Sequence, residues 1–127
     1  MLFRSLGREP LKHWSVGCVS LLGDACHPTL PFLAQGANMA IEDGMVLARC
    51  LEQFADIPEA LQHYEAARLD RTSRIVRGSL ENVGRYHNPH LADPERAAEF
   101  MDREFAPRAI GARYDWLYEY NALTVSV

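Results

Sequence analysis

Residues 21–38 read LLGDACHPTLPFLAQGAN, and this stretch decides how the chain is expected to fold. An apolar run ends at Gly23 and Asp24, a loop with two prolines follows, and a helix begins near Gln35. An apolar run that stops at a glycine is typical of a buried strand, so we expect a strand over residues 16–22. The carboxylate of Asp24 and the N-terminal end of the following helix would then face the same space.

The start of that helix consists of Gly36, Ala37 and Asn38. The first backbone N–H groups of a helix have no partners within it and carry a partial positive charge, which suits an anionic oxygen of a ligand. Asp24 can accept hydrogen bonds from the hydroxyls of a sugar or a ribityl chain. Together they suggest a cradle for a nucleotide cofactor, and a flavin in particular. By spacing alone, a turn residue is the commoner interpretation of Asp24, because turn chemistry accounts for most Asp residues that follow Gly.

The string GDACHPTLPFLAQGANMAIEDGMVLARCL, residues 23–51, resembles the second flavin-contacting motif of the FAD-dependent aromatic hydroxylases, the class A flavoprotein monooxygenases. The similarity is greatest to the salicylate hydroxylase branch, which ALQHYEAAR (residues 60–68) and YDWLYEY (residues 114–120) also resemble. The resemblance implies an α/β fold: residues 1–127 would be the C-terminal portion of a Rossmann-like FAD-binding monooxygenase domain. This portion would be mostly α-helical with one or two short strands, residues 1–34 holding the strands and the flavin loop and residues 35–127 the helical region.

The resemblance also implies which residues would contact FAD. Asp24 would bind the ribityl and pyrophosphate region, and the loop with Pro28 and Pro31 would lie beside the isoalloxazine ring. The backbone amides at the start of the helix would point at the pyrimidine carbonyls of the flavin. The predicted cofactor-binding residues are Asp24, Pro31, Gly36, Ala37 and Asn38. No catalytic residue is predicted here, because in the salicylate branch the catalytic base lies upstream of the segment that this chain resembles.

The activity implied by the resemblance is hydroxylation of a phenolic aromatic acid with NAD(P)H and O2. Which acid is used, and whether NADH or NADPH is the reductant, stay open. The same family begins with a G-x-G-x-x-G turn that holds the FAD pyrophosphate, and no such motif occurs in these 127 residues. We therefore expect a fragment that is inactive alone, and its expected partner is a missing N-terminal half or, by self-association, a second copy of the chain. The alternatives are one half of a split enzyme, or a noncatalytic remnant that acts as a packing or interaction module.

Composition excludes several other classes. A net charge of −4 without a basic stripe argues against nucleic-acid binding, and no run approaches the ~20 apolar residues that a membrane span needs. Three cysteines without a C-x-x-C spacing indicate a reducing, cytoplasmic location. Cys26 and His27 lie close to Asp24, but three ligands on one loop without a fourth rarely bind zinc, so no metal is predicted. We expect His27 to hold Asp24 or a backbone carbonyl by a hydrogen bond.

Hydrophobic spacing and helix-start signals, among them the acids Asp56 and Asp93, predict the helices. Beyond a short strand at Leu2–Leu6, the expected helices cover residues 35–54, 58–85, 93–105 and 114–121. In the first of them the expected apolar face consists of Ala37, Ala40, Ile41, Met45, Leu47, Ala48 and Leu51. Asp43 is expected to face solvent or a packing neighbour. The basic side of the second helix, at Arg68, Arg71, Arg74 and Arg77, is expected to be solvated or to pair with Glu65, Asp70 and Glu81.

Overall fold

The computed structural model describes residues 7–127, so the predicted strand at Leu2–Leu6 lies outside the described residues. The chain forms two compact units. The first comprises the residues up to Asn82 together with Asn121–Val127, and the second comprises Val83–Tyr120. No helix in residues 7–127 is both long and apolar enough to cross a membrane.

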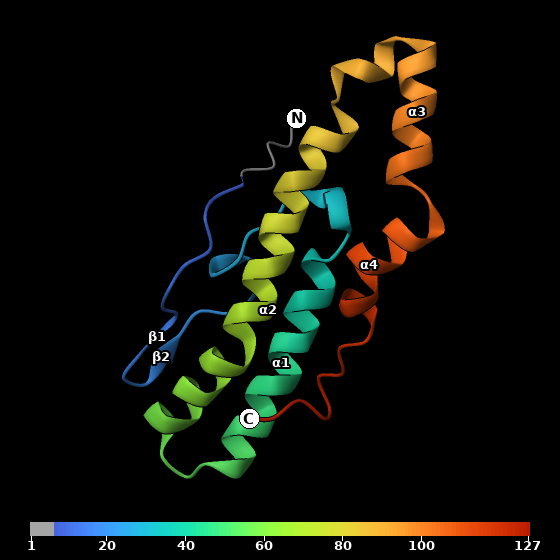
Figure 1. Cartoon of the computed structure of the whole chain (residues 1–127). Helices are drawn as coiled ribbons and strands as arrows, with labels where there is room; N and C mark the ends of the chain where they lie inside the picture. The colour runs from blue at the N-terminus through green and yellow to red at the C-terminus, as the bar shows by residue number, and fades with distance from the viewer. Residues whose placement is uncertain (1–6) are drawn as a thin grey trace. The chain divides into compact units, whose positions relative to one another are not determined.

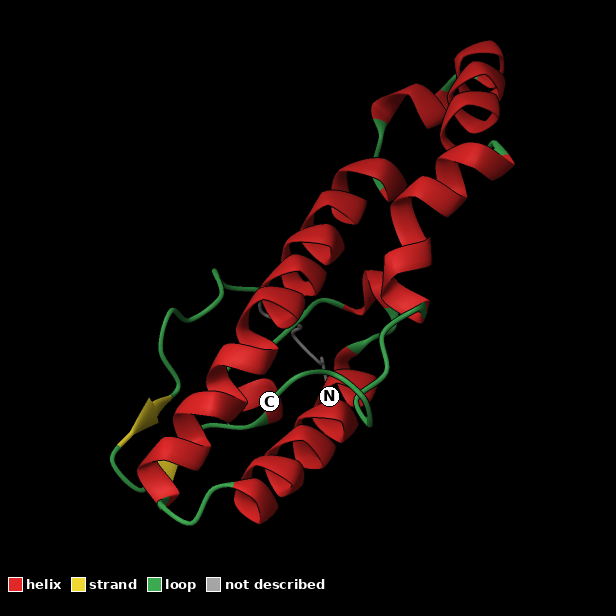
Figure 2. Ribbon diagram, turned by 60° about the horizontal axis from the view of Figure 1, so that its bottom comes forward, coloured by secondary structure: helices red, strands yellow, loops and turns green. Residues whose placement is uncertain are grey.

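Four α-helices account for most of residues 7–127 (Figures 1 and 2). They are α1 (Gly36–Gln53), α2 (Ile57–Tyr86), α3 (Pro94–Glu104) and α4 (Pro107–Tyr118). The predictions for the first three are confirmed to within two residues at each end. The fourth begins at Pro107 and not at Tyr114, because proline is well accommodated in the first turn of a helix, where its missing N–H is not needed.

Two of the helix starts use the caps that the sequence predicts. Asp56 Oδ2 accepts a hydrogen bond of 3.0 Å from the backbone N–H of Glu59 at the start of α2. Asp93 Oδ1 accepts one of 3.0 Å from the backbone N–H of Arg96 at the start of α3. Each bond satisfies one of the donors that a helix end would leave open. The start of α1 has no such side-chain cap, so no capping side chain occupies the backbone N–H groups of its first turn.

The strand expected over residues 16–22 is replaced by a small antiparallel hairpin. Strands β1 (Ser15–Val16) and β2 (Val19–Ser20) pair Ser15 with Ser20 and Val16 with Val19. Gly17 adopts a φ of +56°, a left-handed conformation that glycine accepts readily and that turns the chain back on itself. The two valines are 82% and 69% exposed, so the prediction of one buried strand was wrong.

Helices α1 and α2 run antiparallel beside each other in the first unit, as Figure 1 shows. The hydrophobic core between them and the hairpin consists of Trp14, Cys26, Val46, Cys50, Ala60 and Tyr64. The C-terminal residues Ala122, Val125 and Val127 pack against this core, and Arg49 Nη1 donates a hydrogen bond of 2.9 Å to the carbonyl of Ala122. These contacts hold the helical pair that carries the candidate site.

The buried face of α1 differs from the predicted one. Ile41 is 72% exposed and Met45 and Leu51 are also exposed, whereas the buried residues are Met39, Glu42, Asp43, Val46 and Cys50. Apolar spacing missed this face because two of its five members are carboxylates. They can be buried because charged partners on α2 compensate for the loss of water, as described below.

Candidate functional site

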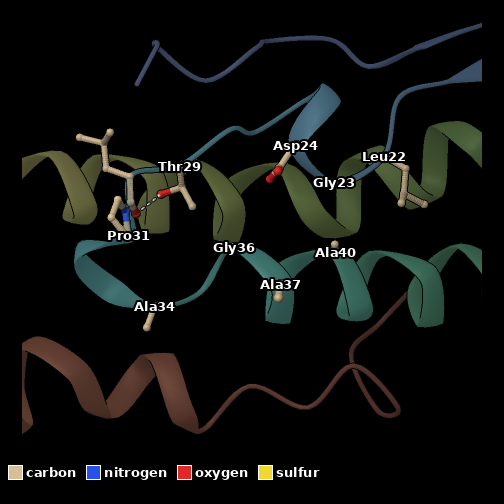
Figure 3. A pocket seen from close by; sticks show the side chains of 10 residues that line it. Leu22, Gly23, Asp24, Thr29, Pro31, Ala34, Gly36, Ala37 and Ala40 are labelled. Atoms are coloured by element: carbon tan, nitrogen blue, oxygen red, sulfur yellow. Dashed lines mark hydrogen bonds between the residues drawn. The ribbon is translucent and has the colours of Figure 1, made fainter. Parts of the chain in front are cut away.

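An open cleft of about 640 Å³ lies between the loop that precedes α1 and the first turns of that helix (Figure 3). Its lining residues are Leu22, Gly23, Asp24, Thr29, Leu30, Pro31, Ala34, Gly36, Ala37 and Ala40. They come from one continuous stretch of sequence, and most have small side chains. The cleft therefore exposes backbone as well as side-chain groups.

One wall of the cleft is the 3₁₀ turn Gly23–Ala25, which presents the exposed side chain of Asp24. Gly23 has a φ of +61°, and a Cβ atom added there would lie 3.3 Å from Cβ of Ala40. Both the backbone conformation and the close approach of α1 thus favour glycine at this position. The turn thus places the Asp24 carboxylate beside α1, and a larger residue at position 23 would push the turn and the helix apart.

The opposite wall is the 3₁₀ turn Pro31–Leu33 and the first turn of α1. Helix α2 holds this loop in place: Ser79 Oγ donates to the carbonyl of Leu30 at 2.6 Å, and Asn82 Nδ2 donates to that of Phe32 at 3.1 Å. Ala34 closes the 3₁₀ turn in a left-handed conformation with a φ of +52°. This reversal directs the chain into α1.

The backbone N–H groups at the start of α1 precede its hydrogen-bond ladder, whose first bond runs from Met39 N to the carbonyl of Gln35 at 2.8 Å. They belong to Gly36, Ala37 and Asn38, and the first two of these residues line the cleft. The helix end thus supplies donors and a partial positive charge at the cleft.

Of the five predicted cofactor-binding residues, the structure brings four together around this cleft: Asp24, Pro31, Gly36 and Ala37. Asn38 does not line it. Its side-chain amide donates to Gln35 Oε1 and to Glu42 Oε1, at 3.0 Å in each case. The roles of all five residues toward a cofactor remain predictions.

Behind the cleft lies a buried carboxylate, Asp43, with no exposed surface. Its Oδ2 accepts hydrogen bonds from Gly23 N at 3.0 Å and from His27 Nε2 at 2.6 Å, and its Oδ1 accepts one of 2.8 Å from Arg68 Nε. The expectation that His27 holds Asp24 or a backbone carbonyl was wrong, because its partner is Asp43. The alternative that Asp43 faces solvent was also wrong, because Asp43 is buried.

Two of the four arginines on the basic side of α2, Arg68 and Arg71, are also buried, which corrects the expectation of a solvated face for these two, whereas Arg74 and Arg77 are exposed as expected. Arg71 binds Glu42 through two parallel hydrogen bonds of 2.9 and 2.8 Å, and Arg68 Nη2 donates to Glu42 Oε2 at 2.8 Å. Glu65, one of the expected partners, instead accepts the backbone N–H groups of Trp14 and Ser15 at 2.8 and 2.7 Å. Helix α2 therefore directs part of its positive charge into the interior, against α1.

The ionisation of these groups follows from their partners. Burial alone would raise the pKa of Asp43, but the hydrogen bonds from His27 and Arg68 outweigh it and hold that pKa below its ordinary value. Glu42 shows the same balance, since burial is opposed by hydrogen bonds and charge from Arg71 and Arg68, so its pKa is also lowered. Both side chains are carboxylates at neutral pH.

Cys26, His27 and Asp43 place one potential metal-binding atom each within 4.8 Å of one another. Burial and the charge of Asp43 raise the pKa of the Cys26 thiol to about 12, so this sulfur is protonated at neutral pH. Both oxygens of Asp43 already accept hydrogen bonds, one of them from the Arg68 guanidinium. These three side chains are therefore better suited to hydrogen bonding with one another than to binding a divalent cation. That the chain has no metal site stays a prediction.

Sequence reasoning missed the four-residue cluster of Glu42, Asp43, Arg68 and Arg71. A signal was present in the helical spacing. Glu42 and Asp43 fall one turn after the buried Met39 and one turn before the buried Val46. Acids placed between buried positions on one helix, and arginines on the buried stripe of the next, indicate buried ion pairs.

Comparisons with known proteins identify the family that this chain resembles. A family model described as "FAD binding domain" matches residues 6–79. The chain is 41% identical over 115 residues to a 3-hydroxybenzoate 6-hydroxylase of Polaromonas naphthalenivorans, covering 90% of this chain and 28% of that protein. It is 52% identical over 80 residues to a 6-hydroxynicotinate 3-monooxygenase of Pseudomonas fluorescens, covering 61% of this chain and 21% of that protein.

Among solved structures, a crystal structure of Klebsiella pneumoniae HpxO complexed with FAD and uric acid is similar with a TM-score of 0.72. The sequences are 33% identical, and the match covers 87% of this chain and 28% of HpxO. The chain thus spans about a fifth to a third of the length of the relatives that it matches.

Proposed function

Because the chain belongs to the FAD binding domain family, with more than half of its residues matched, we propose that residues 1–127 form the C-terminal portion of an FAD-dependent monooxygenase. The predicted family membership and α/β fold class are confirmed by the family match and by the solved neighbour. We propose that the whole enzyme hydroxylates a phenolic aromatic acid with NAD(P)H and O2. Relatives named as a hydroxybenzoate hydroxylase and a hydroxynicotinate monooxygenase support this substrate class.

The observation that carries the proposal is the cleft in which Asp24, Pro31, Gly36 and Ala37 meet. The residues present fit a flavin. An exposed carboxylate accepts hydrogen bonds from ribityl hydroxyls, helix amides donate to carbonyl oxygens, and alanine and glycine walls leave room for a flat ring. We assign Asp24, Pro31, Gly36, Ala37 and Asn38 as the cofactor-binding residues, Asn38 through its backbone amide.

When bound, FAD would supply the redox chemistry between NAD(P)H and O2, and this chain's own residues would hold and orient it. Asp24 binds and orients the cofactor chain from one wall of the cleft. The loop at Pro31 shapes the opposite wall. The N-terminal amides of α1 stabilise negative charge that develops on the flavin pyrimidine, as the donors of an oxyanion hole do. We propose no catalytic residue in this chain, so the base that activates the aromatic acid belongs to the remainder of the enzyme.

We place the enzyme in the cytoplasm, with a small aromatic molecule as its substrate. The three cysteines, Cys18, Cys26 and Cys50, are all free, which suits a reducing compartment. The rest of the catalytic domain would come from an N-terminal half or from a second chain. The small share of each relative that this chain covers supports that proposal.

A hybrid enzyme tests the proposed function. This chain replaces the matching segment of the 3-hydroxybenzoate 6-hydroxylase relative, to which it is 41% identical. We expect the purified hybrid to retain FAD through gel filtration and to oxidise NAD(P)H with formation of a hydroxylated aromatic product. A hybrid that is folded by circular dichroism but takes up no FAD would overturn the proposal and favour the noncatalytic module.

A further inference from the structure

We propose that Asp43 is a positioning residue for cofactor binding: it holds the turn that carries Asp24 and the loop that starts at His27, and so sets FAD affinity without reaching the cofactor. The identity of the ligand rests on the proposed function. Asp43 has no exposed surface and does not line the cleft, so its effect must pass through its neighbours.

The two ends of the Gly23–His27 segment converge on a single atom of Asp43. Oδ2 accepts the backbone N–H of Gly23 at 3.0 Å, immediately before Asp24, and Nε2 of His27 at 2.6 Å, three residues after Asp24. Asp24 therefore sits on a short span that is fastened at both ends to α1. Because the amides assigned to the flavin pyrimidine also belong to α1, one helix sets both walls of the cleft.

The chemistry of these contacts requires a carboxylate. Three donors reach the two oxygens of Asp43: the Gly23 N–H, the His27 imidazole and the Arg68 guanidinium. An asparagine offers one oxygen, and its NH2 group would have to face at least one of these donors. An isosteric Asp43→Asn change thus keeps the volume of the side chain and breaks the set of hydrogen bonds.

The tautomer of His27 allows its Nε2 to donate the hydrogen bond to Asp43. Its ring is buried beside Trp14, with ring centroids 5.5 Å apart, and its Nδ1 has no hydrogen-bond partner within residues 7–127. A proton on Nδ1 would be a buried, unsatisfied donor, so the geometry assigns the proton to Nε2, which donates to Asp43. The short bond then runs from the Nε2–H of His27 to the carboxylate of Asp43.

The hydrogen bonds around Asp43 also extend to the first turn of α1. Arg68 binds Asp43 through Nε and Glu42 through Nη2, and Glu42 in turn accepts the side-chain amide of Asn38. The turn at Gly23 and the first turn of α1 are thereby joined through one buried guanidinium. A change at Asp43 should loosen the Asp24 wall first, because that wall contacts the carboxylate directly.

The test compares Asp43→Asn with Val46→Ala, a buried residue one turn further along α1 that contributes to the core and does not line the cleft. In the chain itself, hydrogen exchange of the peptide spanning residues 22–27 and the His27 Nε2–H signal in nitrogen-15 NMR report on the turn. In the hybrid enzyme, flavin fluorescence titration gives the FAD Kd. His27→Ala serves as a second variant that keeps the Gly23 and Arg68 contacts of Asp43.

We expect Asp43→Asn to lose the downfield Nε2–H signal, to speed exchange at residues 22–27 and to raise the FAD Kd by about tenfold or more, with His27→Ala intermediate. Val46→Ala should lower the melting temperature and leave Kd within about twofold. If wild-type hybrid binds FAD and both network variants match Val46→Ala in Kd, the positioning role is overturned. If wild-type hybrid binds no FAD, the proposed function fails instead, and this role in cofactor binding is overturned with it.

Discussion

Arg68 Nε lies 2.8 Å from Asp43 Oδ1, and neither side chain has exposed surface. This buried pair connects α2 to α1 in the interior of the first unit, behind the cleft. A buried ion pair contributes little net stability when both partners are present, because each charge has lost its water. Removal of one partner is costly, because the other charge is left uncompensated.

Arg68→Ala should therefore destabilise the first unit strongly. It leaves the Asp43 carboxylate buried without its cation, and we expect a loss of about 3–5 kcal/mol in the free energy of unfolding by urea denaturation. Arg77→Ala, on the exposed side of the same helix, is the matched control and should change stability by less than about 0.5 kcal/mol. Equal effects of the two substitutions would contradict the importance of the buried pair.

The lowered pKa values of Glu42 and Asp43 predict a specific pH dependence. Their carboxylates are favoured in the folded chain, so their contribution to stability is fully present above the unfolded values of about 4.3 and 3.9. It is lost as the pH falls below these values through the lowered folded pKa values. Urea midpoints measured from pH 7 to pH 2 should fall steeply below about pH 4.5. Asp43→Asn should flatten this slope, and an unchanged slope would contradict the assignment.

The position of the cleft was largely predictable from the sequence, since four of the five residues predicted to bind the cofactor line it, and all four lie in one loop and one helix start. Local chemistry sufficed there: a glycine turn, prolines and an uncapped helix end each act within a few residues. Helix bounds were predictable for the same reason, through caps such as Asp56 and Asp93.

The cluster of Glu42, Asp43, Arg68 and Arg71 was not predictable from local chemistry, because its ion pairs join residues 25 or more positions apart. Apolar spacing assigns charged residues to the surface, and only the pairing of α1 with α2 makes the burial of Glu42 and Asp43 tolerable. The hairpin was missed because Val16 and Val19 suit a buried strand by composition, while the φ of Gly17 decides the turn.

Two glycines give opposite predictions for stability. Gly44 lies inside α1, and a Cβ atom there would meet nothing within 4 Å, so Gly44→Ala should stabilise the chain by about 0.5–1 kcal/mol. Gly23→Ala should destabilise it, because a left-handed backbone and Ala40 both oppose the added methyl group. Thermal unfolding of both variants checks the pair. A loss of stability in Gly44→Ala would show that this helix position is constrained.

Exposed apolar side chains predict the behaviour of the chain by itself. Val16, Val19, Ile41 and Met45 are exposed in the first unit. We expect the purified chain to bind a hydrophobic dye and to self-associate in analytical ultracentrifugation, because exposed apolar surface favours association. The double variant Val16→Thr and Val19→Thr should reduce dye fluorescence with little effect on stability. A sharp monomer without a dye response would contradict this expectation.

Asp24→Ala tests the cofactor assignment most directly. Its exposed carboxylate lines the cleft, and in the hybrid enzyme it should make charge-assisted hydrogen bonds to cofactor hydroxyls, each worth about 1.5–3 kcal/mol. The substitution should therefore weaken FAD binding by about one to two decades in a flavin fluorescence titration. Asp43 is unsuitable as the control because it contacts the turn, so Asp70→Ala on the exposed face of α2 takes that place and should leave the Kd unchanged. Equal melting temperatures of the two variants would exclude a folding defect as the cause. If Asp24→Ala binds FAD as tightly as wild type, Asp24 serves the turn alone and the assignment of this loop to the cofactor fails.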